Sequence, residues 1–155
     1  MDNGPGFVVV THGGFGEELL RVAQYIMGGK LGGIRAVRVP FQGELQKGAG
    51  ASSVTPFADR QQHVREAIAE AAISVDRGGG VVVLTDIMGG TAFNCARQLL
   101  RTREMAIVAG VNLPMLLKIP TVLRLSCRQA AAELARRSRE AVVLYDGGII
   151  DAKGS

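Results

Sequence analysis

Two ionisable side chains stand directly after short runs of β-branched residues. His12 follows FVVVT (7–11), and Asp86 follows VVVLT (81–85). A neutral imidazole is a nucleophile near neutral pH. A carboxylate bonded to one ring nitrogen would fix the tautomer and stabilise the cation that forms when the other nitrogen attacks. The pair therefore predicts nucleophilic chemistry at His12 with support from Asp86.

Small residues surround both positions and suggest what the nucleophile attacks. These residues are Gly13, Gly14, Gly89, Gly90 and Thr91. Glycines let the backbone approach an anion closely, and both turns are expected to lead into helix N-termini, which favour a phosphate. The hydroxyl of Thr91 would add one donor. Together these residues predict a site for a phosphoryl group carried on His12.

Each feature taken alone also has a structural explanation. A histidine after a strand often serves only as a hydrogen-bonded residue, and Asp86 could be a helix N-cap or turn residue. Neither glycine pair matches GxGxxG or a Walker loop. His63 is expected on a solvated helix face and Cys95 in the core. Asn112 is expected either as a left-handed turn residue or as a wall of the same crevice.

Several other classes of functional site do not fit the residues and motifs present in this sequence. The chain has no GxSxG and no HxxxH, and His12 and His63 are its two histidines, so neither a serine hydrolase nor a metal site is expected. Cys95 and Cys127 have no CxxC partner. The formal charge is +4, but the basic residues are scattered, so no nucleic-acid partner is expected. No cofactor is predicted.

Alternating β-branched and helical segments position the site. We expect strands at 7–11, 34–39, 81–85, 105–109 and 141–145, and helices at 16–27, 57–76, 91–103, 113–125 (interrupted at Pro120) and 126–139. This alternation predicts an α/β fold with a three-layer, mainly parallel open sheet, helices on both faces and a C-terminal antiparallel edge strand. With strand order 2-1-3-4, the ligand crevice lies between the first and third strands, where His12 and Asp86 stand.

Length and the N-terminal sequence suggest the organisation and the compartment. We expect one domain over 1–155 with a core from 7 to 146, because 155 residues match the size of one domain. The first seven residues lack the features of a signal peptide, and no apolar stretch reaches membrane-spanning length. The expected location is the cytoplasm, without membrane insertion.

Three blocks of sequence resemble a known family. VVVTHGGFGEELL, VVVLTDIMGGTAFNCA and MAIVAGVNLPMLLKI are similar to the IIA domain of the mannose/fructose-type sugar phosphotransferase system (PTS). They come in the family's order and cover about residues 7–28 and 80–119. Three features depart from the family pattern, one of them being Ile87-Met88, which replaces the more usual residue pairs. Ala92 stands where proline is usual, and the segment 41–56 is longer than usual.

The resemblance implies a phosphohistidine carrier. It would accept a phosphoryl group from phospho-HPr on His12 and pass it to a separate IIB protein, or act as a phosphorylation-state regulator. Asp86 corresponds to the aspartate that orients the imidazole. The family's Gly-Gly-Ser/Thr loop falls on residues 89–91. Members are typically homodimers that exchange an edge strand, for which 141–145 is the candidate.

Two alternatives remain open on the sequence. The crevice could belong to a non-catalytic regulatory module that binds a sugar phosphate or nucleotide. The phosphotransfer subunit of dihydroxyacetone kinase has a similar fold and phosphohistidine, although the D-x-x-GG segment at 86–90 disfavours it.

Overall fold

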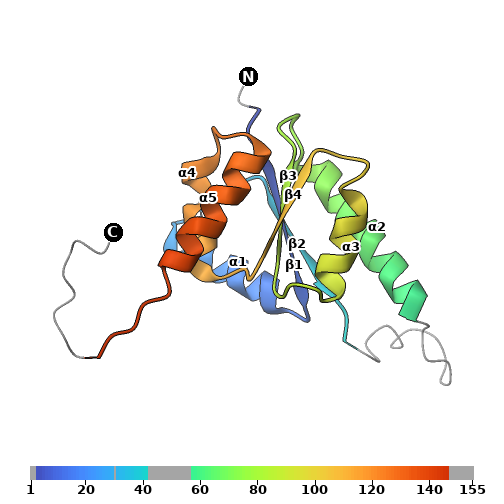
Figure 1. The fold of residues 1–155 in the computed structure, drawn as a ribbon, viewed down its shortest axis with the longest axis horizontal. Coiled ribbons are helices and arrows are strands. Elements are labelled where there is room, and N and C mark those ends of the chain that lie inside the picture. The colour runs from blue at the N-terminus through green and yellow to red at the C-terminus, as the bar shows by residue number, and fades with distance from the viewer. Residues whose placement is uncertain (1–2, 30, 42–56, 147–155) are drawn as a thin grey trace.

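The sheet has four parallel strands in the order β2-β1-β3-β4, as the sequence predicted. The computed structural model describes residues 3–29, 31–41 and 57–146, so segment 42–56 lies outside the described residues. Figure 1 shows the arrangement of the elements. In chain order they are β1 (Gly6–His12), α1 (Phe15–Ile26), β2 (Ile34–Val39), α2 (Phe57–Val75), β3 (Val81–Thr85), α3 (Thr91–Leu99), β4 (Met105–Ala109), α4 (Leu113–Val122) and α5 (Cys127–Glu140).

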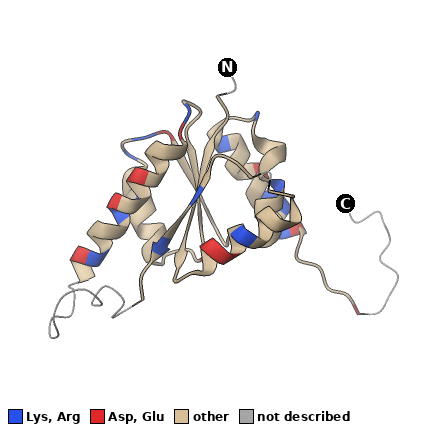
Figure 2. Ribbon diagram, turned by 180° about the vertical axis from the view of Figure 1, so that it is seen from behind, with Lys and Arg blue, Asp and Glu red and all other residues tan. Residues whose placement is uncertain are grey.

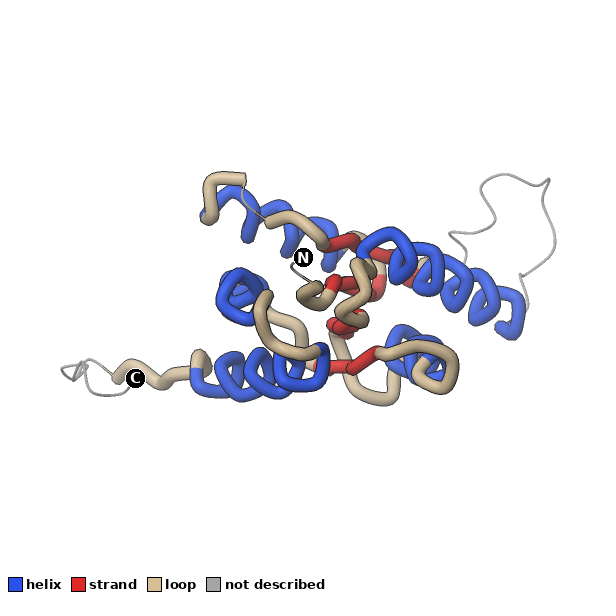
Figure 3. Tube along the Cα trace, turned by 90° about the horizontal axis from the view of Figure 1, so that it is seen from above, coloured by secondary structure: helices blue, strands red, loops and turns tan. Residues whose placement is uncertain are grey.

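Helices cover both faces of the sheet, which forms the middle layer in Figure 3. Successive side chains of a strand point to opposite faces. Phe7 and Val9 of β1 therefore pack with α1, α4 and α5, whereas Val8 and Val10 pack with α2 and α3. All four are fully buried. The unbroken apolar runs of β1 and β3 thus reflect two central strands that are covered on both sides.

Side-chain caps start two of the helices. Ser126 and Gln129 form a capping box at the start of α5, and the side chain of Asn112 accepts a hydrogen bond from the backbone N–H of Met115 at the start of α4. Asn112 has φ −146°, so it is not a left-handed turn residue. Its role in this structure is that of a helix cap.

Two helix predictions were wrong in detail. α4 continues through Pro120 to Val122, because a proline near the end of a helix removes one hydrogen bond and leaves little helix beyond it to disrupt. α3 ends at Leu99 instead of residue 103. The backbone N–H and the hydroxyl of Thr102 both donate to the carbonyl of Leu99, which closes a turn at this point.

The predicted fifth strand does not form within this chain. Residues 141–146 are exposed and belong to no strand, and Figure 1 shows them leading away from the body after α5. A strand needs a neighbour with which to exchange backbone hydrogen bonds, and among residues 3–29, 31–41 and 57–146 no strand pairs with this segment. Strand exchange with a second copy stays a prediction.

Candidate functional site

His12 and Asp86 meet at the carboxyl-terminal edge of the sheet. His12 is the last residue of β1, and Asp86 follows Thr85, the last residue of the neighbouring strand β3. Thr85 pairs with Val10. This register brings together two residues that are 74 positions apart in the sequence.

Asp86 is held by three hydrogen bonds. Its Oδ2 accepts from the backbone N–H of His12 at 2.8 Å and lies 2.7 Å from the Nδ1 of the His12 ring. Its Oδ1 accepts from the backbone N–H of Ile87 at 2.8 Å. Burial on its own would raise the pKa of Asp86, but the hydrogen bonds from His12 and Ile87 outweigh burial and lower it. Asp86 is therefore an anion at neutral pH.

The bond to Asp86 determines which ring nitrogen of His12 is available. A carboxylate can only accept, so Nδ1 carries the proton and donates it to Oδ2. In neutral imidazole Nε2 then holds the lone pair. With 37% of its side chain exposed, His12 is open to a reactant while the ring is oriented by Asp86.

The predicted glycines shape the turns beside His12. Gly13 and Gly89 have φ values of +54° and +79°, in the left-handed region that favours glycine. A Cβ at Gly90 would lie 3.4 Å from Cε1 of His12. Gly14 precedes α1 and Gly90 precedes α3. The structure thus brings both glycine pairs and two helix N-termini to His12.

A cavity of about 180 Å³ opens beside His12, with Thr91 in its wall. Its lining also includes Phe41, Phe57 and Arg60, which sequence reasoning missed. The packing of α2 against the sheet brings Phe57 and Arg60 to the site, and Phe41 follows the end of β2. The spacing of Phe57 and Arg60, three residues apart on a helix, was the one available signal. A larger surface depression, about 570 Å³, is lined by Arg97, Gln98, Leu100 and Arg101 and includes neither a histidine nor a carboxylate.

Other candidate residues stand outside this cluster. His63 is exposed on α2, and Cys95 and Cys127 are buried free thiols whose pKa is raised by burial, as expected for core residues. Within 3–29, 31–41 and 57–146, no group of three or more His, Cys, Asp or Glu residues could hold a metal ion. None of the helices in these ranges is long and apolar enough to span a membrane. Both signs of charge are distributed over the helices (Figure 2).

The chain belongs to the family of IIA components of the PTS. A family model described as "PTS system fructose IIA component" matches residues 6–138, which include the whole sheet and most of α5. The chain is thus a IIA component of the mannose/fructose type, as its motifs predicted.

Individual relatives agree with this assignment. The mannose-specific EIIAB component of Escherichia coli K12 is 29% identical over 112 residues, which are 72% of this chain and 29% of that protein. The chain therefore aligns with less than a third of this relative. The mannose/sorbose-specific IIA subunit of Enterococcus faecalis superposes with a TM-score of 0.71 at 25% identity, over 96% of this chain and 99% of the subunit. The EIIA component of Streptococcus agalactiae, at 22% identity and a TM-score of 0.65, shares the fold over 89% and 95% of the two chains.

Proposed function

We propose that this protein is a phosphohistidine carrier. It accepts a phosphoryl group from phospho-HPr on His12 and passes it to a separate IIB protein. The observation that supports this most directly is the 2.7 Å contact between His12 Nδ1 and Asp86 Oδ2, which leaves Nε2 as the nucleophile.

The transfer step is a displacement at phosphorus. The Nε2 lone pair of His12 forms a new N–P bond, and the N–P bond of the donor phosphohistidine breaks with its electron pair returning to the donor imidazole. The His12 ring gains positive charge in this step while Nδ1 keeps its proton. Asp86, held as an anion, stabilises that charge. Transfer to the acceptor runs through the same steps with His12 as the donor.

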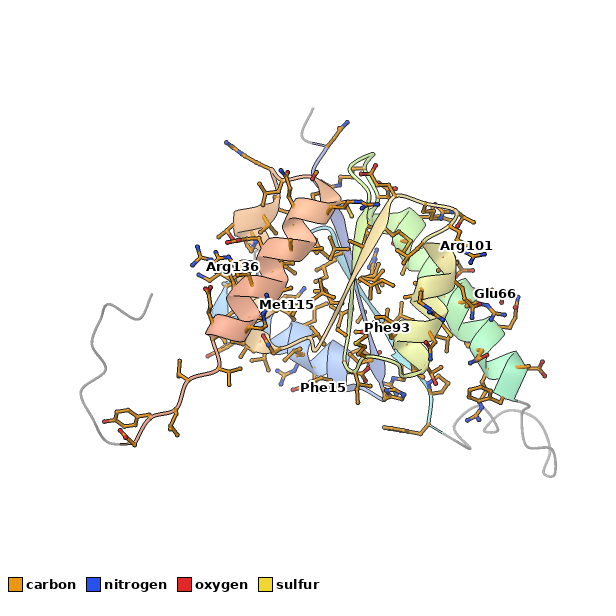
Figure 4. All side chains as sticks on the ribbon, viewed as in Figure 1. Phe15, Glu66, Phe93, Arg101, Met115 and Arg136 are labelled. Carbon is orange, nitrogen blue, oxygen red and sulfur yellow. The ribbon has the colours of Figure 1, made fainter. Side chains whose placement is uncertain are left out.

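The surroundings of His12 suit a protein donor and a protein acceptor. Phe15, Ile87 and Met88 are 50%, 59% and 76% exposed; Phe15 is the first residue of α1, and Ile87 and Met88 lie in the turn after β3. Figure 4 labels Phe15 at the start of α1, on the edge of the molecule where the strands end. Exposed apolar side chains grouped around a reactive residue are typical of a surface that another protein covers. They support docking around His12.

Oligomeric state, compartment and domain extent form part of the same proposal. Val142, Val143 and Leu144 are 81%, 76% and 92% exposed, which favours cover by a second copy in a homodimer. We place the carrier in the cytoplasm, as one IIA domain over residues 1–155 with its core from 7 to 146. The acceptor is either a IIB protein of a sugar transporter or a regulatory target.

Phosphorylation by the phosphoenolpyruvate chain tests the proposal. The purified protein is incubated with phosphoenolpyruvate, enzyme I and HPr, and its intact mass is measured. We expect one added phosphoryl group in the wild type and in His63→Ala, and none in His12→Ala. His63 is the matched control because it is the other histidine and is exposed on α2.

The competing function is a non-catalytic module that binds a nucleotide or sugar phosphate. It predicts no mass gain with active enzyme I and HPr, together with micromolar binding in calorimetric titrations with these ligands. That combination of results would replace the carrier proposal.

A further inference from the structure

The cavity beside His12 is built against one particular helix. His12 follows Val8 and Val10 in the strand alternation, and these two side chains pack toward α2 and α3. His12 lines the cavity together with Phe57, Arg60 and Val64 of α2. The face of the sheet on which His12 lies is therefore the face that α2 covers, even though α2 carries none of the family's motif residues.

Most of the cavity wall is apolar. Val39 and Val64 are 4% and 1% exposed, whereas Phe41 and Phe57 are 55% and 58% exposed. Such walls lower the local dielectric and strengthen any charge interaction inside. The polar side chains of the lining are those of His12, Arg60 and Thr91.

Arg60, which lines the cavity, has one hydrogen-bond donor without a partner among the described residues. Its Nε is buried and has no hydrogen-bond partner among the residues that the structure describes. Its Cζ lies 5.6 Å from the centre of the Phe57 ring, within reach of a cation–π contact that supports the guanidinium without an acceptor. A buried N–H of a guanidinium calls for an acceptor, and an anion meets that need best.

The phosphoryl group on His12 has the matching chemistry. It carries negative charge and several strong acceptor oxygens, and arginine binds phosphoryl oxygens through its planar fork of donors. A volume of about 180 Å³ holds such a group with several waters, at about 30 Å³ each. Thr91 can donate its hydroxyl from the start of α3.

We infer that Arg60 binds the phosphoryl group carried by His12, so that the cavity between β1 and α2 is the pocket in which this group resides between transfers. The inference rests on the proposed carrier function. The inference adds a third group to the histidine and aspartate of the family motif. This group is Arg60 of α2, a cation that binds the phosphoryl group.

The first experiment removes the need for a protein donor. Phosphoramidate, a small chemical donor, transfers its phosphoryl group to the His12 nitrogen and leaves as ammonia. The phosphohistidine signal is then followed by ³¹P NMR as pH is varied, in wild type, Arg60→Met and Arg60→Lys. Arg65→Met is the matched control, because Arg65 lies on the same helix and bonds to Gln98 instead of lining the cavity.

We expect Arg60→Met to shift the ³¹P resonance and to raise the apparent pKa of the bound phosphoryl group, because a nearby cation favours its dianion. Arg60→Lys, which keeps the charge, restores part of both effects. Arg65→Met behaves as wild type. Identical resonances and titrations in wild type and Arg60→Met would overturn the inference, as would failure of phosphoramidate to modify wild-type His12.

The second experiment measures single-turnover transfer from phospho-HPr. We expect Arg60→Met to slow it by about tenfold or more, as removal of one donor to a developing anion does, with Arg65→Met unchanged. If phospho-HPr fails to modify the wild type while the NMR effects of Arg60 are present, the carrier function is wrong and the phosphoryl-binding pocket stands. If transfer occurs equally fast in Arg60→Met, the carrier function stands and the role of Arg60 in transfer is wrong.

Discussion

The two ends of the sheet use the same residue types for different purposes. At the amino-terminal end of the strands, glycines lie where backbones touch. A Cβ on Gly6 would come 2.4 Å from the carbonyl oxygen of Val75, and one on Gly80 would come 2.7 Å from that of Glu104. At the carboxyl-terminal end, a Cβ on Gly89 would have no neighbour within 4 Å. Glycine thus permits close packing of backbones at the amino-terminal end, whereas Gly89 at the carboxyl-terminal end borders open space.

An aspartate at each end shows the same contrast. Asp76 accepts from the backbone N–H groups of Gly78 and Gly80 at 2.8 and 3.2 Å, so it closes a turn. Asp86 also accepts backbone N–H groups, but its Oδ2 additionally contacts the His12 ring. Substitutions at the amino-terminal end should therefore affect stability, and those at the carboxyl-terminal end should affect phosphoryl transfer.

The largest effect is expected for Gly6→Ala at the packed end. The new methyl group would collide with the carbonyl of Val75, which cannot move without shifting the end of α2, so we expect a loss of about 3 kcal/mol in the free energy of unfolding. Denaturant titration measures it. Gly32→Ala is the control, since a Cβ there meets nothing within 4 Å and should leave stability nearly unchanged. Equal stabilities of the two variants would contradict the steric role of Gly6.

Asp86→Asn, at the carboxyl-terminal end of the sheet, should slow phosphoryl transfer while the fold persists. The amide has one acceptor oxygen, so it can keep only one of the two backbone N–H hydrogen bonds that Asp86 accepts. It also no longer fixes the tautomer or stabilises the cation, so transfer from phospho-HPr should slow by about 10²-fold. Rapid-quench single-turnover kinetics measure the rate, and circular dichroism checks that the fold persists. Transfer at the wild-type rate would remove Asp86 from the proposed mechanism.

The variants Gly13→Ala and Gly28→Ala distinguish the effect of backbone strain from the effect of a changed cavity beside His12. Both positions have positive φ, +54° and +64°, so each alanine should cost about 1 kcal/mol of stability. At Gly13 the methyl group would also meet the Phe41 ring at 2.4 Å, and Phe41 lines the cavity, so transfer should slow by about tenfold in this variant alone. Unfolding and transfer assays on the pair decide between the two causes. An unchanged transfer rate in Gly13→Ala would show that Phe41 can move without consequence.

Asp76→Ala should cost about 1 kcal/mol of stability and leave transfer unchanged. The substitution removes the acceptor for two backbone N–H groups at an exposed turn, where water can replace it in part. The same denaturant and transfer assays measure both quantities. Slowed transfer in this variant would show that the two ends of the sheet are coupled.

Asp86, at the carboxyl-terminal end of the sheet, should also make the stability of the protein depend on pH. Because the folded-state pKa of Asp86 is lowered, its stabilising contribution is fully present above the ordinary carboxyl pKa and is lost as pH falls through the folded-state value. The unfolding free energy of wild type relative to Asp86→Asn should therefore be constant above about pH 5 and fall below about pH 4. Denaturant titrations over this range measure the difference. If the difference in unfolding free energy does not change with pH, the ionised carboxylate of Asp86 does not contribute to the stability of the fold.

Much of the fold could be predicted because its signals are local. The strands at 34–39, 81–85 and 105–109 match the structure, since short β-branched runs bounded by turn residues specify buried parallel strands. The end of α3, the path through Pro120 and the absence of a strand at 141–145 in this chain could not be predicted. The end of α3 and the path through Pro120 depend on local hydrogen bonds that compete with continuation of a helix, which periodicity does not resolve. A strand at 141–145 needs a neighbouring strand, which nearby residues in the sequence do not supply.

The sequence by itself indicated the family, the parallel α/β fold and the two segments that bear His12 and Asp86, whereas the strand order 2-1-3-4 was assumed as the common one and the structure established it. Strand ends and glycine turns are encoded over a few residues, and parallel strands place their carboxyl ends at one edge. Only the tertiary structure decided that Nδ1 faces Asp86 and that Arg60, Phe41 and Phe57 line the cavity beside His12. These contacts depend on strand register and on how α2 packs against the sheet, which arise from burial of surfaces distant in sequence.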